Sequence, residues 1–92
     1  FVATLRNAAT VESINDRYKE ASQDELSKVL EYTDQPLVSS DFKQNPSSCI
    51  IDGLSTMVMD GNMVKVVGWY DNEWGYSCRT ADLTSFIAGK GL

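Results

Sequence analysis

A chain of 92 residues with 13 acidic and eight basic side chains forms one domain at most and carries a net charge of −5. Its scattered bases form no basic patch of the kind that nucleic-acid binders carry, and the acidic balance disfavours anionic membrane surfaces. The longest apolar stretch, Met63 to Tyr70, is broken by Lys65 and Gly68 and is far too short to span a bilayer. We therefore expect a cytoplasmic protein with neither a nucleic-acid nor a membrane partner.

The chain contains no histidine, which removes the commonest general base and the commonest metal ligand. Its two cysteines, Cys49 and Cys78, are too few for a disulfide framework. Neither has a flanking Lys or His that would activate a thiol, so we expect both to be small buried residues rather than reactive groups. We predict no metal site.

The first third of the chain predicts a strand followed by a helix. Residues 1–6 are typical of a strand end, and Thr10 is a plausible N-cap with Glu12 in the first turn, where an acid suits the helix dipole. Apolar residues at helical spacing then predict an amphipathic helix over residues 11–22. A short helical turn is expected over residues 25–30.

The middle of the chain predicts short strands. Pro36 excludes a continuous central strand, so residues 30–42 are expected to hold two short strands around a turn. The Asp60-Gly61 step lies between two β-prone runs, residues 55–59 and 63–70, and this arrangement is a strong signature of a hairpin.

A strand over residues 49–52 is expected to join the sheet of this hairpin, and a second helix follows over about residues 74–88. Gly89 and Gly91 mark its end. The pattern predicts an α+β fold with an antiparallel or mixed sheet, helices packed on one side and a C-terminal helix. One stripe of that helix is largely apolar and consists of Tyr76, Thr80, Leu83 and Ile87.

Residues 69–77, WYDNEWGYS, closely resemble the signature near the C-terminus of phosphorylating glyceraldehyde-3-phosphate dehydrogenases. Residues 30–42, LEYTDQPLVSSDF, and residues 47–67, SSCIIDGLSTMVMDGNMVKVV, resemble the family segments that precede this signature. The resemblance extends over essentially the whole chain. It implies that residues 1–92 are the C-terminal portion of the catalytic domain of a two-domain dehydrogenase whose complete form is a homotetramer.

The resemblance also implies a reaction. The family oxidises glyceraldehyde 3-phosphate with NAD or NADP and inorganic phosphate, in glycolysis and gluconeogenesis, through a cysteine that attacks the aldehyde and a histidine that activates it. The family's S-C-T-T-N motif, its histidine and its glycine-rich dinucleotide fingerprint do not occur in these 92 residues. The cofactor-binding domain and the catalytic segment are therefore expected to lie elsewhere, and the isolated chain is expected to be inactive.

Four residues carry over from the family's active site. Asn72 matches the asparagine whose amide contacts the nicotinamide carboxamide, and Tyr76 matches a tyrosine that lines the nicotinamide pocket. Tyr70 and Glu73 match positions near the catalytic cysteine, so we place them beside the pocket and assign no catalytic residue within the chain.

Each of these residues also has a structural interpretation. Asn72 precedes a helix and is typical of an N-cap, although its oxygen can cap while its NH2 faces the nicotinamide. Glu73 is typical of a first-turn acid, and Tyr70 and Tyr76 could serve only in packing.

The sequence is also compatible with two other functions. The chain could be a non-enzymatic oligomerisation or binding module, or a gene remnant. It could also belong to a related sugar-phosphate dehydrogenase that acts on a four-carbon phosphate. The WYDNEWGYS segment favours the triose phosphate enzyme, whereas nothing in the chain distinguishes NAD from NADP.

Overall fold

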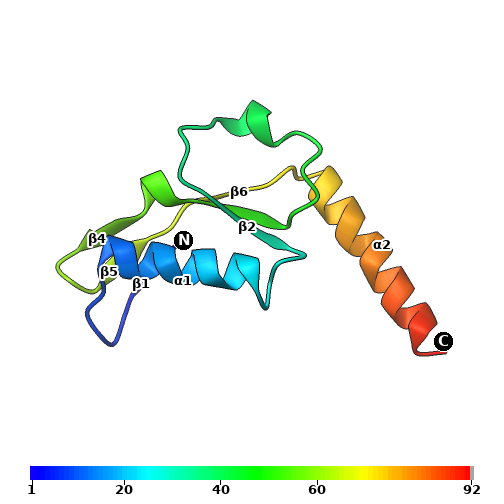
Figure 1. The fold of residues 1–92 in the computed structure, drawn as a ribbon, viewed down its shortest axis with the longest axis horizontal. Coiled ribbons are helices and arrows are strands. Elements are labelled where there is room, and N and C mark those ends of the chain that lie inside the picture. The colour runs from blue at the N-terminus through cyan, green and yellow to red at the C-terminus, as the bar shows by residue number, and fades with distance from the viewer. Residues whose placement is uncertain (92) are drawn as a thin grey trace.

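The computed structural model describes residues 1–91, which form two α-helices, six short strands and two 3-10 helices (Figure 1). The α+β class predicted from the sequence is confirmed. In chain order the elements are β1 (Val2–Thr4), α1 (Val11–Gln23), β2 (Leu30–Thr33), η1 (Ser39–Phe42), β3 (Cys49–Asp52), η2 (Gly53–Ser55), β4 (Met57–Met59), β5 (Met63–Lys65), β6 (Gly68–Trp69) and α2 (Trp74–Gly89).

Helix α1 begins at a reciprocal capping box. Thr10 Oγ1 accepts a hydrogen bond from Ser13 N at 3.0 Å, and Thr10 N donates to Ser13 Oγ at 3.0 Å. The predicted N-cap is therefore confirmed, and the helix ends at Gln23, close to the predicted break. The following turn contains a helical hydrogen bond from Leu30 N to Leu26 O at 2.8 Å.

The predicted hairpin is confirmed and forms one sheet with the first strand. The strand order is β1-β5-β4, and both pairings are antiparallel. Asp60 and Gly61 adopt φ values of 53° and 80°, the left-handed conformation for which an Asp-Gly step is suited. The paired strands are shorter than predicted, because residues 66–70 leave this sheet.

A second sheet has the order β2-β3-β6, with β2 parallel to β3 and β3 antiparallel to β6. The continuous strand predicted over residues 63–70 is wrong in this respect, since its two halves belong to different sheets. The chain crosses between them at Val66 and Val67, where Val66 N donates to Phe1 O and Val67 O accepts from Asp52 N. Strand β3 consequently pairs with β6 and not with the hairpin.

The second of the two strands predicted within residues 30–42 is also wrong, because a 3-10 helix, η1, takes its place. The Asp41 carboxylate accepts a hydrogen bond from Val38 N at 2.7 Å, which closes the segment into a turn. A side chain that satisfies a nearby backbone N–H in this way competes with strand pairing.

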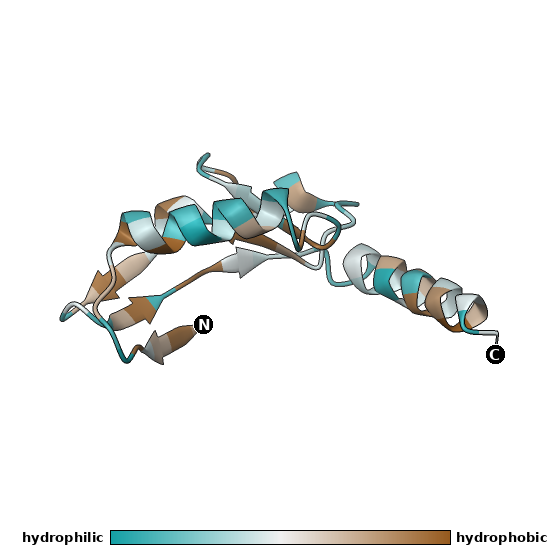
Figure 2. Cartoon of the chain, turned by 60° about the horizontal axis from the view of Figure 1, so that its bottom comes forward, coloured by the Kyte–Doolittle hydropathy of each residue, from teal (hydrophilic) through white to brown (hydrophobic). Residues whose placement is uncertain are grey.

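Helix α1 covers the core, which lies between it and the strands (Figure 2). Helix α2 instead extends away from both sheets in Figures 1 and 2, and its apolar stripe is exposed. No helix within residues 1–91 has the length and apolar character needed to cross a membrane. The buried cluster consists of Ala21, Leu30, Ile51 and Val66, with Ile14, Tyr18, Tyr32 and Cys49 packed against it.

Candidate functional site

The turn between β6 and α2 is organised by the Asp71 carboxylate. Asp71 Oδ1 accepts hydrogen bonds from Glu73 N at 3.0 Å and from Trp74 N at 2.9 Å. Asp71 O accepts from Gly75 N at 2.9 Å, as the carbonyl of a capping residue does. The capping role proposed for Asn72 is therefore wrong, because a charged oxygen one position earlier already satisfies the N–H groups at the positive end of the helix dipole.

The same carboxylate holds a loop that lies 27 positions upstream. Asp71 Oδ2 accepts a hydrogen bond from Gln44 N at 2.8 Å. The bonds from Trp74 N and Gln44 N hold the pKa of Asp71 below its ordinary value of 3.8, so the group is ionised at neutral pH. Both oxygens thus bind backbone donors, one set from α2 and one from the loop.

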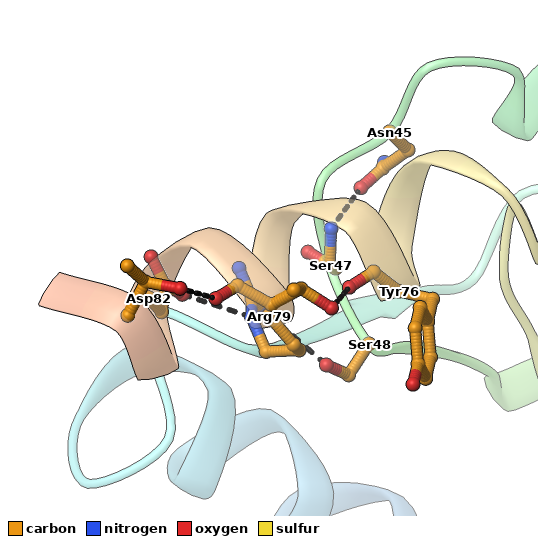
Figure 3. Close-up of polar contacts among 8 residues, drawn as sticks. Asn45, Ser47, Ser48, Tyr76, Arg79 and Asp82 are labelled. Carbon is orange, nitrogen blue, oxygen red and sulfur yellow. Dashed lines mark hydrogen bonds and ion pairs between the residues drawn. The ribbon is translucent and has the colours of Figure 1, made fainter. Parts of the chain in front are cut away.

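A second set of contacts joins the first turns of α2 to residues 47 and 48, directly before β3 (Figure 3). Gly75 is buried, and a Cβ at this position would lie 3.0 Å from Ser47 O, so a larger residue would require the neighbouring backbone to move. One turn further, Arg79 Nη1 donates to Ser48 Oγ at 3.2 Å. Arg79 also forms an ion pair within α2, with Nε 2.9 Å from Asp82 Oδ2, although this contact lacks hydrogen-bond geometry.

Three of the predicted site residues line one hollow. Tyr70, Asn72 and Glu73 face a concavity of about 390 Å³ whose other wall includes Lys43 and Gln44. Asn72 is exposed, and its amide makes no hydrogen bond within residues 1–91. The amide is therefore available to an external polar group, with one acceptor and two donor hydrogens.

The fourth predicted residue, Tyr76, lines a neighbouring hollow of about 150 Å³ together with Ser48, Tyr70 and Gly75. Tyr76 is 75% exposed and Tyr70 is 60% exposed. Tyr70 is common to both hollows and thus lies between Asn72 and Tyr76. Such exposed aromatic surface on one turn is available to a partner, and the interpretation of these tyrosines as core residues does not hold for residues 1–91.

A third hollow, of about 290 Å³, lies between β1, β5 and α1 and contains no predicted site residue. The cysteines also lie outside the two hollows of the turn. Burial raises the pKa of the half-buried Cys49 thiol above its ordinary value of 9.0, as expected of an inert cysteine, and Cys78 is half-buried in α2. Within residues 1–91 no group of three or more potential metal ligands comes together.

The turn between β6 and α2 thus presents an exposed amide and two exposed tyrosines. The family model described as "Glyceraldehyde 3-phosphate dehydrogenase, C-terminal domain" matches residues 1–72. The chain therefore belongs to the glyceraldehyde-3-phosphate dehydrogenase family, and it corresponds to the C-terminal part of such an enzyme.

Curated relatives agree with this assignment. The chain is 55% identical to glyceraldehyde-3-phosphate dehydrogenase of Priestia megaterium, over 99% of this chain and 27% of the relative's length. It is 53% identical to glyceraldehyde-3-phosphate dehydrogenase 1 of Bacillus subtilis, over the same shares of each chain. It is 48% identical to the cytosolic glyceraldehyde-3-phosphate dehydrogenase of Chlamydomonas reinhardtii, over 95% and 26%. The chain thus spans about a quarter of the length of these relatives.

Sequence reasoning found the exposed residues of the turn but missed the residues that hold it. Asp71 was detectable, because Asp directly before a helix is a preferred cap. The contacts of Gly75 and Arg79 with residues 47–48 were not detectable, because they join segments about 30 positions apart.

Proposed function

We propose that this chain forms the nicotinamide-facing wall of an enzyme that oxidises glyceraldehyde 3-phosphate with NAD or NADP and inorganic phosphate. The proposal rests on the exposed amide of Asn72, which makes no hydrogen bond within residues 1–91 and lies beside Tyr70 in the hollow at the start of α2. The nicotinamide ring, when bound, supplies the hydride acceptor. The Asn72 amide pairs with its carboxamide and fixes which face of the ring meets the substrate.

The chain's own residues bind and orient, and they perform no covalent step. Tyr76 closes one side of the nicotinamide position, and Tyr70 and Glu73 lie beside the reacting centre. The cysteine nucleophile and its histidine partner come from the part of the enzyme outside these 92 residues. Orientation of this kind lowers the barrier because the reacting groups meet in a productive geometry without further loss of freedom.

The exposed stripe of α2 supports a larger assembly. Leu83 and Ile87 are 58% and 42% exposed, which is unusual for large apolar side chains one turn apart on a helix. We assign this stripe to packing against the cofactor domain of the same enzyme. A homotetramer in the cytoplasm is part of the same proposal.

Alone, the chain is expected to lack dehydrogenase activity and to bind the dinucleotide weakly or not at all. Association costs on the order of 4–15 kcal/mol in lost freedom. One amide hydrogen bond returns only about 0.5–1.5 kcal/mol. Asn72 and two tyrosines therefore cannot hold a dinucleotide without the adenine, ribose and pyrophosphate sites that lie elsewhere.

The test is an activity assay of the full-length protein that carries this segment. The assay measures the formation of reduced cofactor from NAD or NADP in the presence of glyceraldehyde 3-phosphate and inorganic phosphate. A parallel assay replaces glyceraldehyde 3-phosphate with a four-carbon aldehyde phosphate. We expect phosphate-dependent reduction that is faster with the triose. Faster turnover of the four-carbon substrate would favour the related sugar-phosphate dehydrogenase, and no activity with either would favour the non-enzymatic module.

A further inference from the structure

We infer that Asp71 is a positioning residue for the dinucleotide, which sets the Asn72 amide in place by holding both the start of α2 and the loop around Gln44. The inference rests on the proposed function, in which Asn72 faces the nicotinamide. It adds a residue whose carboxylate faces inward to the backbone and is not expected to touch the cofactor.

The Asp71 carboxylate binds backbone donors from two separate segments. Asp71 accepts three backbone hydrogen bonds, two from Glu73 N and Trp74 N and one from Gln44 N, all between 2.8 and 3.0 Å. Charge-assisted bonds of this kind are roughly twice as strong as neutral ones. One side chain therefore joins two segments that form opposite walls of the same hollow.

Asn72 lies along the chain between the carboxylate and one of its donors. Its preceding residue carries the carboxylate, and the N–H of its following residue, Glu73, is bound to that carboxylate. This bond holds the peptide group after Asn72, and the bond from Gly75 N to Asp71 O holds the peptide group before it. The Asn72 side chain itself makes no hydrogen bond within residues 1–91. Gln44 has a φ of 59°, an unusual conformation for a residue with a side chain, which the bond to Asp71 helps to maintain.

The two connections made by the carboxylate can be separated by a substitution that removes one acceptor oxygen. Asn at position 71 has one acceptor oxygen and one NH2 group. It can cap α2 or accept from Gln44 N, but it cannot do both, because its NH2 would then face an N–H donor. Asp71→Asn therefore keeps the shape of the side chain and loses one of the two connections, whereas Asp71→Ala loses both.

The experiment measures two affinities of the full-length protein. One ligand is the complete dinucleotide, and the other is ADP-ribose, which lacks the nicotinamide. We expect Asp71→Ala to raise the Kd of the dinucleotide roughly threefold to tenfold, as the loss of one or two hydrogen bonds would, and to leave the Kd of ADP-ribose unchanged. Asp71→Asn should give a smaller change in the same direction.

A matched control comes from the other helix cap. Thr10→Ala removes the side-chain cap of α1, whose oxygen accepts from Ser13 N at 3.0 Å. It should lower the unfolding temperature, as the Asp71 variants do, and it should leave both affinities unchanged. A merely structural role of Asp71 would make its variants behave like Thr10→Ala.

The Asn72→Ala variant distinguishes failure of this inference from failure of the proposed function. Suppose that Asn72→Ala raises the Kd of the dinucleotide and not that of ADP-ribose, while neither Asp71 variant raises the Kd of the dinucleotide. The positioning role is then overturned and the proposed function stands. An equal rise in the Kd of the dinucleotide and in the Kd of ADP-ribose in the Asp71 variants would also overturn the inference. If Asn72→Ala leaves both affinities unchanged, the proposed function fails and this inference fails with it.

Discussion

The rings of Phe42 and Trp69 stack with centroids 5.7 Å apart and planes 14° apart. Phe42 is 4% exposed and closes η1, whereas Trp69 ends β6 and leads directly into the turn of the candidate site. Trp69 Nε1 also donates to Asp52 Oδ2 at 3.2 Å. The strand that enters the site is thereby held on one side by an aromatic contact and on the other by a buried carboxylate.

We predict that Phe42→Ala lowers the free energy of unfolding by about 3–5 kcal/mol, because it empties a buried aromatic position. Phe42→Leu, which keeps most of the volume, should cost clearly less. Guanidinium unfolding of the full-length protein, followed by tryptophan fluorescence, measures both. A loss of unfolding free energy below about 0.5 kcal/mol for Phe42→Ala, which is the size typical of a surface substitution, would show that the stack does not hold β6.

Gly68 provides a second test of the packing under this strand. A Cβ at Gly68 would lie 2.5 Å from Cys49 Sγ, with no other atom closer than 3.9 Å. Gly68→Ala should therefore destabilise the protein by about 1–3 kcal/mol through overpacking. The Cys49→Ala background removes the clashing atom, so the same change should cost less there, with a coupling of about 0.5–3 kcal/mol in a double-mutant cycle. Additive effects would contradict this packing.

The pH dependence of stability should report on Asp71. Its folded pKa lies below the ordinary value of 3.8, so the carboxylate stabilises the fold fully above that value. This contribution is lost as the pH falls through the lower, folded pKa. The stability difference between wild type and Asp71→Asn should thus favour wild type at pH 6 and narrow below about pH 4. A difference that stays constant down to pH 2 would contradict the assignment.

The exposed stripe of α2 predicts self-association of the isolated 92-residue chain. Its large aliphatic members Leu83 and Ile87 are exposed within residues 1–91, and exposed apolar surface of this kind associates in water. Sedimentation of the isolated chain should show oligomers that Leu83→Lys reduces. Ser85→Lys adds the same charge about 200° around the helix and should have little effect. A monomer at all concentrations would contradict the exposure of this stripe.

The local patterns of the sequence predicted the elements that local chemistry determines. Thr10 and its capping partner lie three residues apart, and the Asp60-Gly61 step makes its own turn, so both were readable. The division of residues 63–70 between two sheets was not readable, because it depends on Phe1 and Asp52 bonding to Val66 and Val67.

The same distinction explains what was found of the candidate site. The exposed residues of the turn were identified through the WYDNEWGYS resemblance, since they are contiguous. The capping role of Asn72 was wrong because two residues with similar capping ability stand side by side, and only the hydrogen bonds of the folded chain show that the Asp71 side chain is the one turned inward. The contact of Gly75 with Ser47 depends on tertiary structure and has no local signal.

In the proposed function the Asn72 amide faces the nicotinamide, and the most direct measurement of this contact is the dinucleotide KM and kcat of full-length Asn72→Asp. Asp keeps the size of the side chain and a capping oxygen, but it lacks the NH2 donor. We predict a KM for the dinucleotide raised by roughly tenfold or more, with a lower kcat, because a charged acceptor then faces the carboxamide oxygen. Unchanged KM and kcat would contradict the account.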